Sequence, residues 1–260
     1  MKKRISLTID EKLLKLLDRN RYKSRSSAIE DILKKYFNEK IAVILAGGPS
    51  EHLWIPKLKR YRPLVKIGKK TLMEDIMDKV IDIEYKKFIF IGSKEIIEAV
   101  KKEINEEYDI TFIEENKFGG TASTLYLARN YIKNTFLILP CDHYFDFSLK
   151  ELEHVHNQNN FIITLAVYAG AGYEWNKSAF VKMNGHEITE YSDNNIKTHL
   201  TSTMISFAEP EIFDMIKNRK SLEEIFLTLI QSKKLGGVII NGNFVNIHSV
   251  NDLLIARRLR

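Results

Sequence analysis

The residues of this chain that point most directly to chemistry are two adjacent glycines, Gly47 and Gly48, which follow the apolar run at 41–45. Such a run is typical of a strand buried on both faces, and Ala46 with the two glycines then forms a loop that exposes its backbone. The glycines alone are a weak signal, because a simple turn also selects glycine. Basic residues around the loop either supply charge to a ligand or form a solvated face. These residues are Lys57, Lys59, Arg60 and Lys66.

A second group of polar residues lies near the N-terminus, where the charge of the chain is concentrated. Residues 1–40 hold 12 Lys and Arg against 6 Asp and Glu, whereas the whole chain of 260 residues holds 40 against 34. Residues 41–260 are therefore neutral as a group. Such asymmetry predicts a nucleic-acid-binding segment joined to a part with a different task.

The bulk composition limits the class of protein. A chain of 260 residues fits one medium domain and a small module. We find no apolar run of the roughly 18–20 residues that a membrane span needs, and the first residues are too polar for a secretory signal, so we expect a cytoplasmic protein without a membrane partner. The single cysteine, Cys141, excludes an intrachain disulfide.

The N-terminal elements cannot form a core alone. Residues 4–9 alternate polar and apolar side chains, which predicts a half-buried strand. Asp10 caps a Leu-rich helix, and Ser24 or Ser26 caps a second helix after a break at 20–23. One strand has no ladder partner and two short helices bury little surface, so we expect two chains to pair.

This pattern resembles the ribbon-helix-helix family over nearly all of residues 1–38. The resemblance implies a dimer whose paired strands enter the major groove of double-stranded DNA and read base edges. The second helix would hold a phosphate at its N-terminus. An ordinary strand-helix-helix used only for dimerisation is the alternative for the module at 1–39. The implied DNA-binding residues are Arg4, Ser6, Thr8, Ser24, Arg25 and Ser26.

From residue 40 onward, apolar runs alternate with amphipathic stretches. This rhythm predicts an α/β domain over 40–260, with a Rossmann-like, mainly parallel sheet flanked by helices. The strands are expected at 41–45, 88–91, 111–113, 136–139 and 162–167, and helices at 72–83 and 95–104.

Motifs along this part of the chain resemble those of sugar-phosphate nucleotidylyltransferases, in the right order and spacing. They are Leu-Ala-Gly-Gly at 45–48, Arg-Pro-Leu-Val at 62–65, Gly-Thr-Ala at 120–122, the strand and aspartate at 137–143, the segment 203–212, and the strand and helix start at 244–253. The resemblance implies a loop that cradles a nucleoside triphosphate, basic residues on its phosphates, and a magnesium ion held by two aspartates.

Carried over by position, the resemblance assigns a nucleotide site, a catalytic arginine and a metal site. His143 beside the metal aspartate either orients the site or is structural. The nucleotide-binding residues are Ala46, Gly47, Gly48, Gly120 and Thr121; the catalytic residue is Arg62; the metal ligands are Asp142 and Asn246.

Several positions depart from the family pattern. His52 stands where a phosphate-clamping arginine is expected, and Arg62 replaces a lysine. The segment 190–192 lacks the lysine of a sugar-phosphate site, and Asn246 replaces the second metal aspartate. Together these changes predict degraded catalysis.

Our main hypothesis is therefore a dimeric DNA-binding transcriptional regulator whose C-terminal domain binds a nucleotide or nucleotide sugar as effector. The alternative is an active magnesium-dependent sugar-phosphate nucleotidylyltransferase with an appended DNA-binding module. A scaffold that binds no small molecule is a third possibility.

Overall fold

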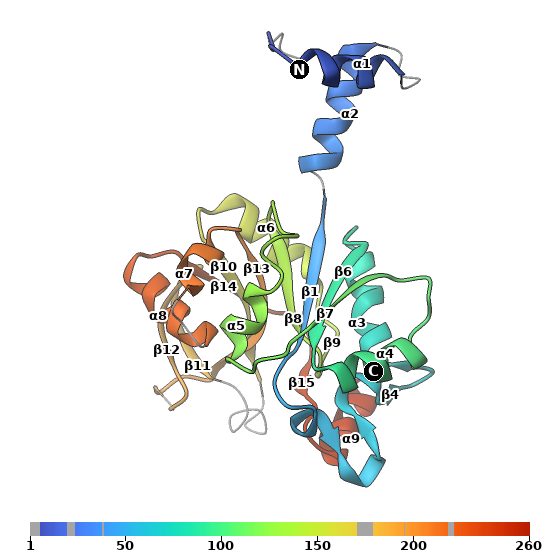
Figure 1. Cartoon of the computed structure of the whole chain (residues 1–260). Coiled ribbons are helices and arrows are strands. Elements are labelled where there is room, and N and C mark those ends of the chain that lie inside the picture. Colours follow the sequence, from blue (N-terminus) through green and yellow to red (C-terminus); the bar gives the residue numbers. More distant parts are fainter. Residues whose placement is uncertain (1–5, 20–23, 38, 171–178, 195, 218–220) are drawn as a thin grey trace. The chain divides into compact units, whose positions relative to one another are not determined.

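The computed structural model describes residues 6–19, 24–37, 39–170, 179–194, 196–217 and 221–260 (Figure 1). The chain divides into two compact units, residues 1–39 and residues 40–260, which we call the first unit and the body. Among the described helices, none combines the length and apolar content that crossing a bilayer requires.

The first unit contains the two expected helices, α1 (Glu11–Arg19) and α2 (Arg25–Phe37). Asp10 caps α1, since its Oδ1 accepts from the backbone N–H of Lys12 at 2.8 Å. Ser24 and Ser27 cap α2 reciprocally, each side chain accepting from the other's backbone N–H at 3.1 Å.

The predicted N-terminal strand is absent from the part that the structure describes. Residues 6–10 belong to no strand, and residue 4 lies outside the described residues. The physical reason is that a strand requires a ladder partner, and this single chain offers none there. Ser6 and Thr8 are both exposed.

The body is a large sheet with helices on both sides (Figure 1). Its helices are α3 (Leu72–Ile81), α4 (Lys94–Glu103), α5 (Thr121–Tyr126), α6 (Leu149–Gln158), α7 (Ile212–Ile216), α8 (Leu222–Gln231) and α9 (Val250–Leu259). The main sheet contains β1 (Ile41–Ala46), β6 (Lys87–Gly92), β7 (Asp109–Glu114), β8 (Phe136–Pro140), β10 (Ile163–Ala169), β11 (Phe180–Asn184), β12 (Glu187–Ser192), β13 (Leu200–Ala208) and β14 (Leu235–Ile239). The α/β prediction is confirmed, with the expected strands and helices within a few residues of their predicted bounds.

The expectation of a mainly parallel sheet is wrong. The strand order is β10-β14-β12-β11-β13-β8-β1-β6-β7, and only the β8-β1-β6-β7 side and the β10–β14 pair are parallel. β13 runs antiparallel to both β8 and β10, and β11 is antiparallel to β12. Because β1 and β8 are parallel, the carboxyl end of β1, followed by the glycine loop, lies at the same edge of the sheet as the carboxyl end of β8.

Short elements cover that edge of the sheet. The chain after β1 forms β2 (Trp54–Ile55), β3 (Arg60–Tyr61), β4 (Lys66–Ile67) and β5 (Lys70–Thr71), separated by the 3₁₀ turns η1 (Ser50–Leu53), η2 (Pro56–Leu58) and η3 (Arg62–Leu64). After β8, the strand β9 (His143–Phe145) pairs antiparallel with β15 (Phe244–Asn246). The strand that precedes the last helix therefore lies against the segment that follows β8.

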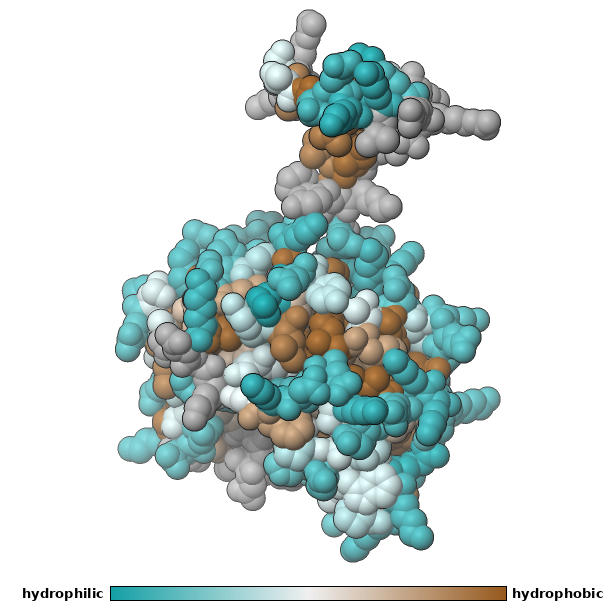
Figure 2. Space-filling view, in the orientation of Figure 1, coloured by the Kyte–Doolittle hydropathy of each residue, from teal (hydrophilic) through white to brown (hydrophobic). Residues whose placement is uncertain are grey.

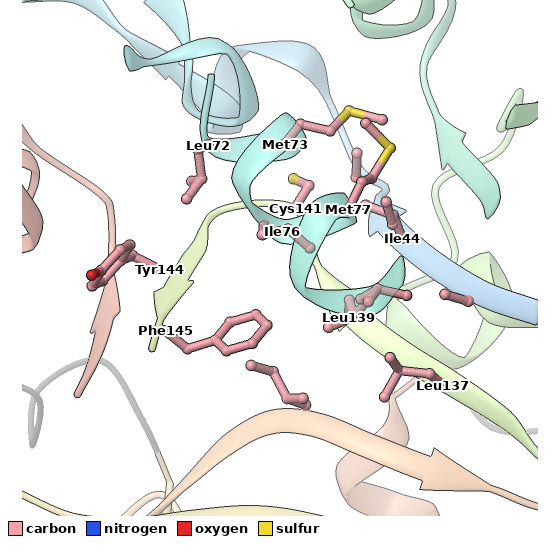
Figure 3. Close-up of a cluster of buried hydrophobic side chains, with 14 of the residues drawn as sticks. Ile44, Leu72, Met73, Ile76, Met77, Leu137, Leu139, Cys141, Tyr144 and Phe145 are labelled. Carbon is pink, nitrogen blue, oxygen red and sulfur yellow. The ribbon is translucent and has the colours of Figure 1, made fainter. Parts of the chain in front are cut away.

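Two apolar cores, one on each face of the sheet, fix these elements. Alternate residues of β1 enter different cores, Ile44 the first and Val43 the second. Figure 3 shows Ile44 and Leu139 in the first core, against Met73 and Met77 of α3. Full burial of each such side chain stabilises the fold by roughly 1.5–3 kcal/mol. The two cores therefore fix the strands whose ends carry the polar residues.

Candidate active site

The glycine loop is fixed by a buried carboxylate. Glu115, at the end of β7, accepts the backbone N–H of Gly48 at 2.7 Å through Oε2, and the hydroxyl of Thr124 at 2.6 Å through Oε1. A Cβ on Gly47 would lie 2.4 Å from Thr124 Oγ1, and Gly48 has a φ of +88°. Both positions therefore require glycine, one for space and one for backbone conformation.

Glu115 and Thr124 are site residues that the sequence analysis missed. For Glu115 the strand pattern contained a signal. β1 and β7 run parallel in one sheet, so the polar residues that follow them lie at the same edge. Glu115 directly follows β7, just as the glycines follow β1.

Arg62 and Asp142 form a largely buried ion pair, with Nη1 and Oδ2 2.9 Å apart. Their side chains are only 16% and 11% exposed. Arg62 begins η3, where Pro63 fixes the turn, and Asp142 follows β8. The Nε atom of Arg62 is buried and has no hydrogen-bond partner among the described residues. The guanidinium thus keeps one donor free beside the carboxylate.

Two histidines flank Asp142. His143 Nε2 lies 3.5 Å from Oδ1, and His248 Nε2 lies 3.8 Å from Oδ2. The Nδ1 of His143 contacts the carbonyl of Thr203 at 2.9 Å and donates to it, because a carbonyl can only accept. Burial lowers the pKa of His143, opposed by the charge of Asp142. His143 thus ties the Asp142 segment to β13.

Asn246 lies beside this group through the ladder of β9 and β15. It is opposite His143 in register, its side chain is buried, and the next residue, Ile247, donates its N–H to the carbonyl of Asp142 at 2.9 Å. Within the described residues no group of three His, Cys, Asp or Glu side chains could hold a metal ion. Asp142 and Asn246 fit a magnesium ion nevertheless, because this ion is usually bound by one or two carboxylates and by substrate phosphates.

A cleft of about 330 Å³ opens at this edge of the sheet. It brings together all five predicted nucleotide-binding residues and Asp142. Arg62, the ion-pair partner of Asp142, is not part of the lining. The other lining residues come from β1, η1, α5, β8 and the residue after it, β13 and the start of α8. The lining comprises Leu45, Ala46, Gly47, Gly48, Leu53, Gly120, Thr121, Thr124, Ile138, Pro140, Cys141, Asp142, Met204, Leu222 and Glu223.

Other predicted positions lie outside this lining. His52 is exposed, and so are Lys57, Lys59 and Lys66. Arg60 pairs with Glu103 at 2.6 Å. The basic residues therefore match the solvated-face interpretation better than a phosphate clamp.

The residues assigned to DNA binding that the structure describes lie in the first unit. Ser24, Arg25 and Ser26 are exposed at the start of α2. Arg25 donates two hydrogen bonds to Asp18 of α1, each 2.7 Å long, and this pairing raises its pKa. Arg25 therefore links the two helices in this chain.

The sequence model of the family Nucleotidyl transferase matches residues 41–172, half of the chain. This chain belongs to the nucleotidyl transferase family. The match begins with β1 and includes the glycine loop, Arg62, Gly120 and Asp142. The match does not include the first unit.

Curated relatives of this chain include the protein named Bifunctional protein GlmU in several archaea. The chain is 29% identical over 236 residues to that of Methanococcus vannielii and 23% identical over 235 residues to that of Methanocaldococcus jannaschii. These matches cover 83% and 84% of this chain. The chain spans about half the length of these relatives, 53% in both cases.

Solved structures share the fold of the nucleotidyl transferase body. A putative glucose-1-phosphate thymidylyltransferase from Bacillus anthracis matches with a TM-score of 0.74, over 85% of this chain and 94% of that one, at 15% identity. A UDP-glucose pyrophosphorylase complexed with UDP-glucose matches with a TM-score of 0.69, over 85% and 97%, also at 15% identity. None of these relations supports DNA binding, so they favour the enzyme alternative over the regulator that the sequence analysis put first.

Proposed function

We propose that the body is a magnesium-dependent sugar-phosphate nucleotidylyltransferase. A phosphate oxygen of the sugar phosphate would attack the α-phosphorus of a nucleoside triphosphate, forming a new P–O bond while the bond to pyrophosphate breaks. The observation that carries this proposal is the buried pair of Arg62 and Asp142 beside a glycine loop, in a chain of the nucleotidyl transferase family.

The residues of the cleft divide the work by their chemistry. The loop at 46–48, fixed by Glu115, lets the nucleotide approach the main chain without side-chain obstruction. Arg62 brings a permanent positive charge into a largely buried position, where charge on the α-phosphate is stabilised most strongly. Asp142 and Asn246 would hold magnesium, which neutralises charge on the phosphates when it is bound.

The substitutions relative to the family pattern leave this chemistry feasible. The Asn246 amide oxygen is an ordinary ligand of hard cations, although it lacks charge. Arg62 keeps the positive charge of the lysine that it replaces. His52 is the clearest loss, because an imidazole lacks the bidentate hydrogen-bonding geometry of the arginine that it replaces.

The test is pyrophosphate release from each nucleoside triphosphate combined with a panel of sugar phosphates and magnesium. The proposal expects release with at least one pair. If every pair is inactive while a nucleotide still binds, the effector hypothesis replaces the enzyme. Binding is measured by the ligand's stabilisation of the fold, which grows with its concentration above Kd.

For the first unit we propose that residues 1–39 pair with a second copy and bind double-stranded DNA. Support comes from the net charge of residues 1–40 and from apolar side chains that stay exposed, with Leu7 and Leu13 both 56% and Ile32 46% exposed. Figure 2 shows such apolar surface on the first unit. In the proposed dimer Arg4, Ser6 and Thr8 would face the bases.

Gel-shift assays at several salt concentrations test this second proposal. The full chain should shift a specific DNA, and Arg4→Ala should weaken binding, by roughly tenfold if Arg4 makes one good base contact. Failure to bind any DNA at low salt would rule out the proposal, since phosphate contacts are strongest there. Lys2→Ala, two residues away, is the matched control for loss of one charge.

A further inference from the structure

Met204 has an unusual backbone conformation for its place in the fold. It lies within β13, yet its φ is +60°, in the left-handed region. A residue with a Cβ is rare there and strained, and in a strand the conformation interrupts the ladder. The pairing register of β10 and β13 indeed shifts between Leu165 and Val167, opposite this part of β13.

Hydrogen bonds on both sides of Met204 maintain this conformation. Its own N–H donates to Ser202 Oγ at 3.2 Å, and the N–H of Ile205 donates to Thr203 Oγ1 at 3.2 Å. The Thr203 hydroxyl donates in turn to the carbonyl of Ala166 at 2.8 Å. The Thr203 carbonyl accepts from His143, as described above. A strained residue persists only where its surroundings determine it in this way, and such residues cluster at functional sites.

The side chain of Met204 is held as well. Its Sδ accepts a weak hydrogen bond from the hydroxyl of Tyr191 at 3.5 Å. Tyr191 is buried, with its ring 5.2 Å from that of Phe226 in an edge-to-face arrangement. Met204 is thus an anchored part of the cleft wall.

The strand order gives the place of Met204 along the cleft. β8 lies between β1 and β13, so Asp142 at the end of β8 lies between the glycine loop and Met204. On the proposed function, a nucleotide at the glycine loop would bring its phosphates to Arg62 and Asp142. The group beyond them, toward Met204, would belong to the second substrate.

We infer that Met204 is a specificity-determining residue that limits the size of the acceptor phosphate. The inference rests on the proposed function, since it assigns the two ends of the cleft to the two substrates. A glycine would adopt the same backbone without strain and would leave this space open. Met204 therefore favours acceptors whose sugar or polyol carries no bulky substituent.

The test compares the full-length protein with Met204→Gly and Met204→Ala in calorimetric titrations with magnesium present. Glucose 1-phosphate is the compact probe, and N-acetylglucosamine 1-phosphate is the substituted one. The ratio of their dissociation constants, substituted over compact, should fall by about tenfold or more in Met204→Gly, the effect of removing a few buried atoms from a pocket wall. Met215→Ala, which truncates a methionine of the second core outside the cleft, should leave the ratio unchanged.

Folding is followed in the same variants. Met204→Gly should melt at a higher temperature than Met204→Ala, because alanine keeps the strain and glycine removes it. This order supports the backbone argument, and the reverse order overturns it.

The possible results separate the inference from the proposed function. A ratio in Met204→Gly within about threefold of the original protein overturns the inference. So does the absence of binding of either probe to any of the proteins, because the opened cleft would then admit no acceptor. A changed ratio without pyrophosphate release by the original protein supports the inference and overturns the catalytic proposal.

Discussion

The first unit and the body contain similar apolar residues but cover them differently. In the first unit, Ala28 is the one apolar side chain buried among those that the structure describes, and Leu7, Leu13 and Ile32 stay exposed. In the body, both faces of the sheet bury continuous cores. The charge differs in parallel, with the whole net charge in residues 1–40.

If residues 1–39 pair as proposed, this difference separates a segment that needs a partner from a domain that is stable by itself. Two short helices bury too little surface to be stable alone, so their apolar side chains gain stability only when another molecule covers them. In the body, by contrast, apolar residues of the cleft such as Leu53 and Leu222 are buried within the same chain. Four substitutions test this difference.

The largest effect is expected at Asp142. Asp142→Asn removes the only carboxylate in the proposed metal pair and the partner of Arg62, so the rate of pyrophosphate release should fall about 100-fold or more. Asp82→Asn, at the exposed end of α3, is the control. Self-association through the first unit should not change, and equal activity in both variants would refute the assigned role.

The next effect concerns the first unit. Leu13→Asp places a charge on an exposed apolar position of α1, which would be buried between two chains. A dimer should become a monomer in sedimentation velocity, because a buried unpaired charge costs several kcal/mol. Lys12→Asp, the neighbouring exposed residue, is the control. Thermal unfolding of the body should be unchanged, and a variant that still dimerises would show that this face is not the interface.

A smaller effect is expected from the carboxylate that fixes the glycine loop. Glu115→Ala leaves the N–H of Gly48 without its acceptor, which should cost about 1–3 kcal/mol of the free energy of unfolding and weaken nucleotide binding. Denaturant unfolding at unchanged m-value measures the loss. Glu114→Ala, exposed in the adjacent position, should be nearly neutral. Equal midpoints for the two variants would argue against the role of Glu115.

The smallest effect depends on pH. The pKa of Glu209 is lowered from 4.5, first by its hydrogen bond with His156. A lowered pKa stabilises the fold above about pH 4.5, and this contribution is lost as the pH falls through the folded-state value. Glu209→Gln should therefore melt lower than the original protein at pH 7, and the difference in melting temperature should shrink as the pH falls below 4.5. A melting difference that persists in acid would assign the effect to packing.

The sequence predicted the parallel side of the sheet because its strands are continuous apolar runs. Ile41–Ala46 and Phe136–Pro140 carry this signal within a few residues. The antiparallel region could not be predicted in the same way, since pairing of β13 with both β8 and β10 depends on contacts between distant segments.

The site shows the same division. The glycines at 47–48 and Asp142 follow predicted strands, so their presence at one edge could be expected. Two interactions arise only from tertiary packing. They are the ion pair of Arg62 with Asp142, 80 positions away, and the hydrogen bond from the N–H of Gly48 to Glu115. The left-handed backbone conformation of Met204 could not be predicted from the sequence, because methionine does not favour a positive φ.

The place of β1 in the sheet also has a consequence for biosynthesis. β1 is the first strand of the body to leave the ribosome, yet both of its neighbours come later, with Val43 paired to Ile89 and to Ile138. Until β8 is made, this fully apolar strand has an open edge and is prone to pair with other chains. Long-range pairing of this kind slows folding. We therefore expect one edge of β1 to stay open until β8, which ends at Pro140, has been synthesised, at nearly half the length of the body.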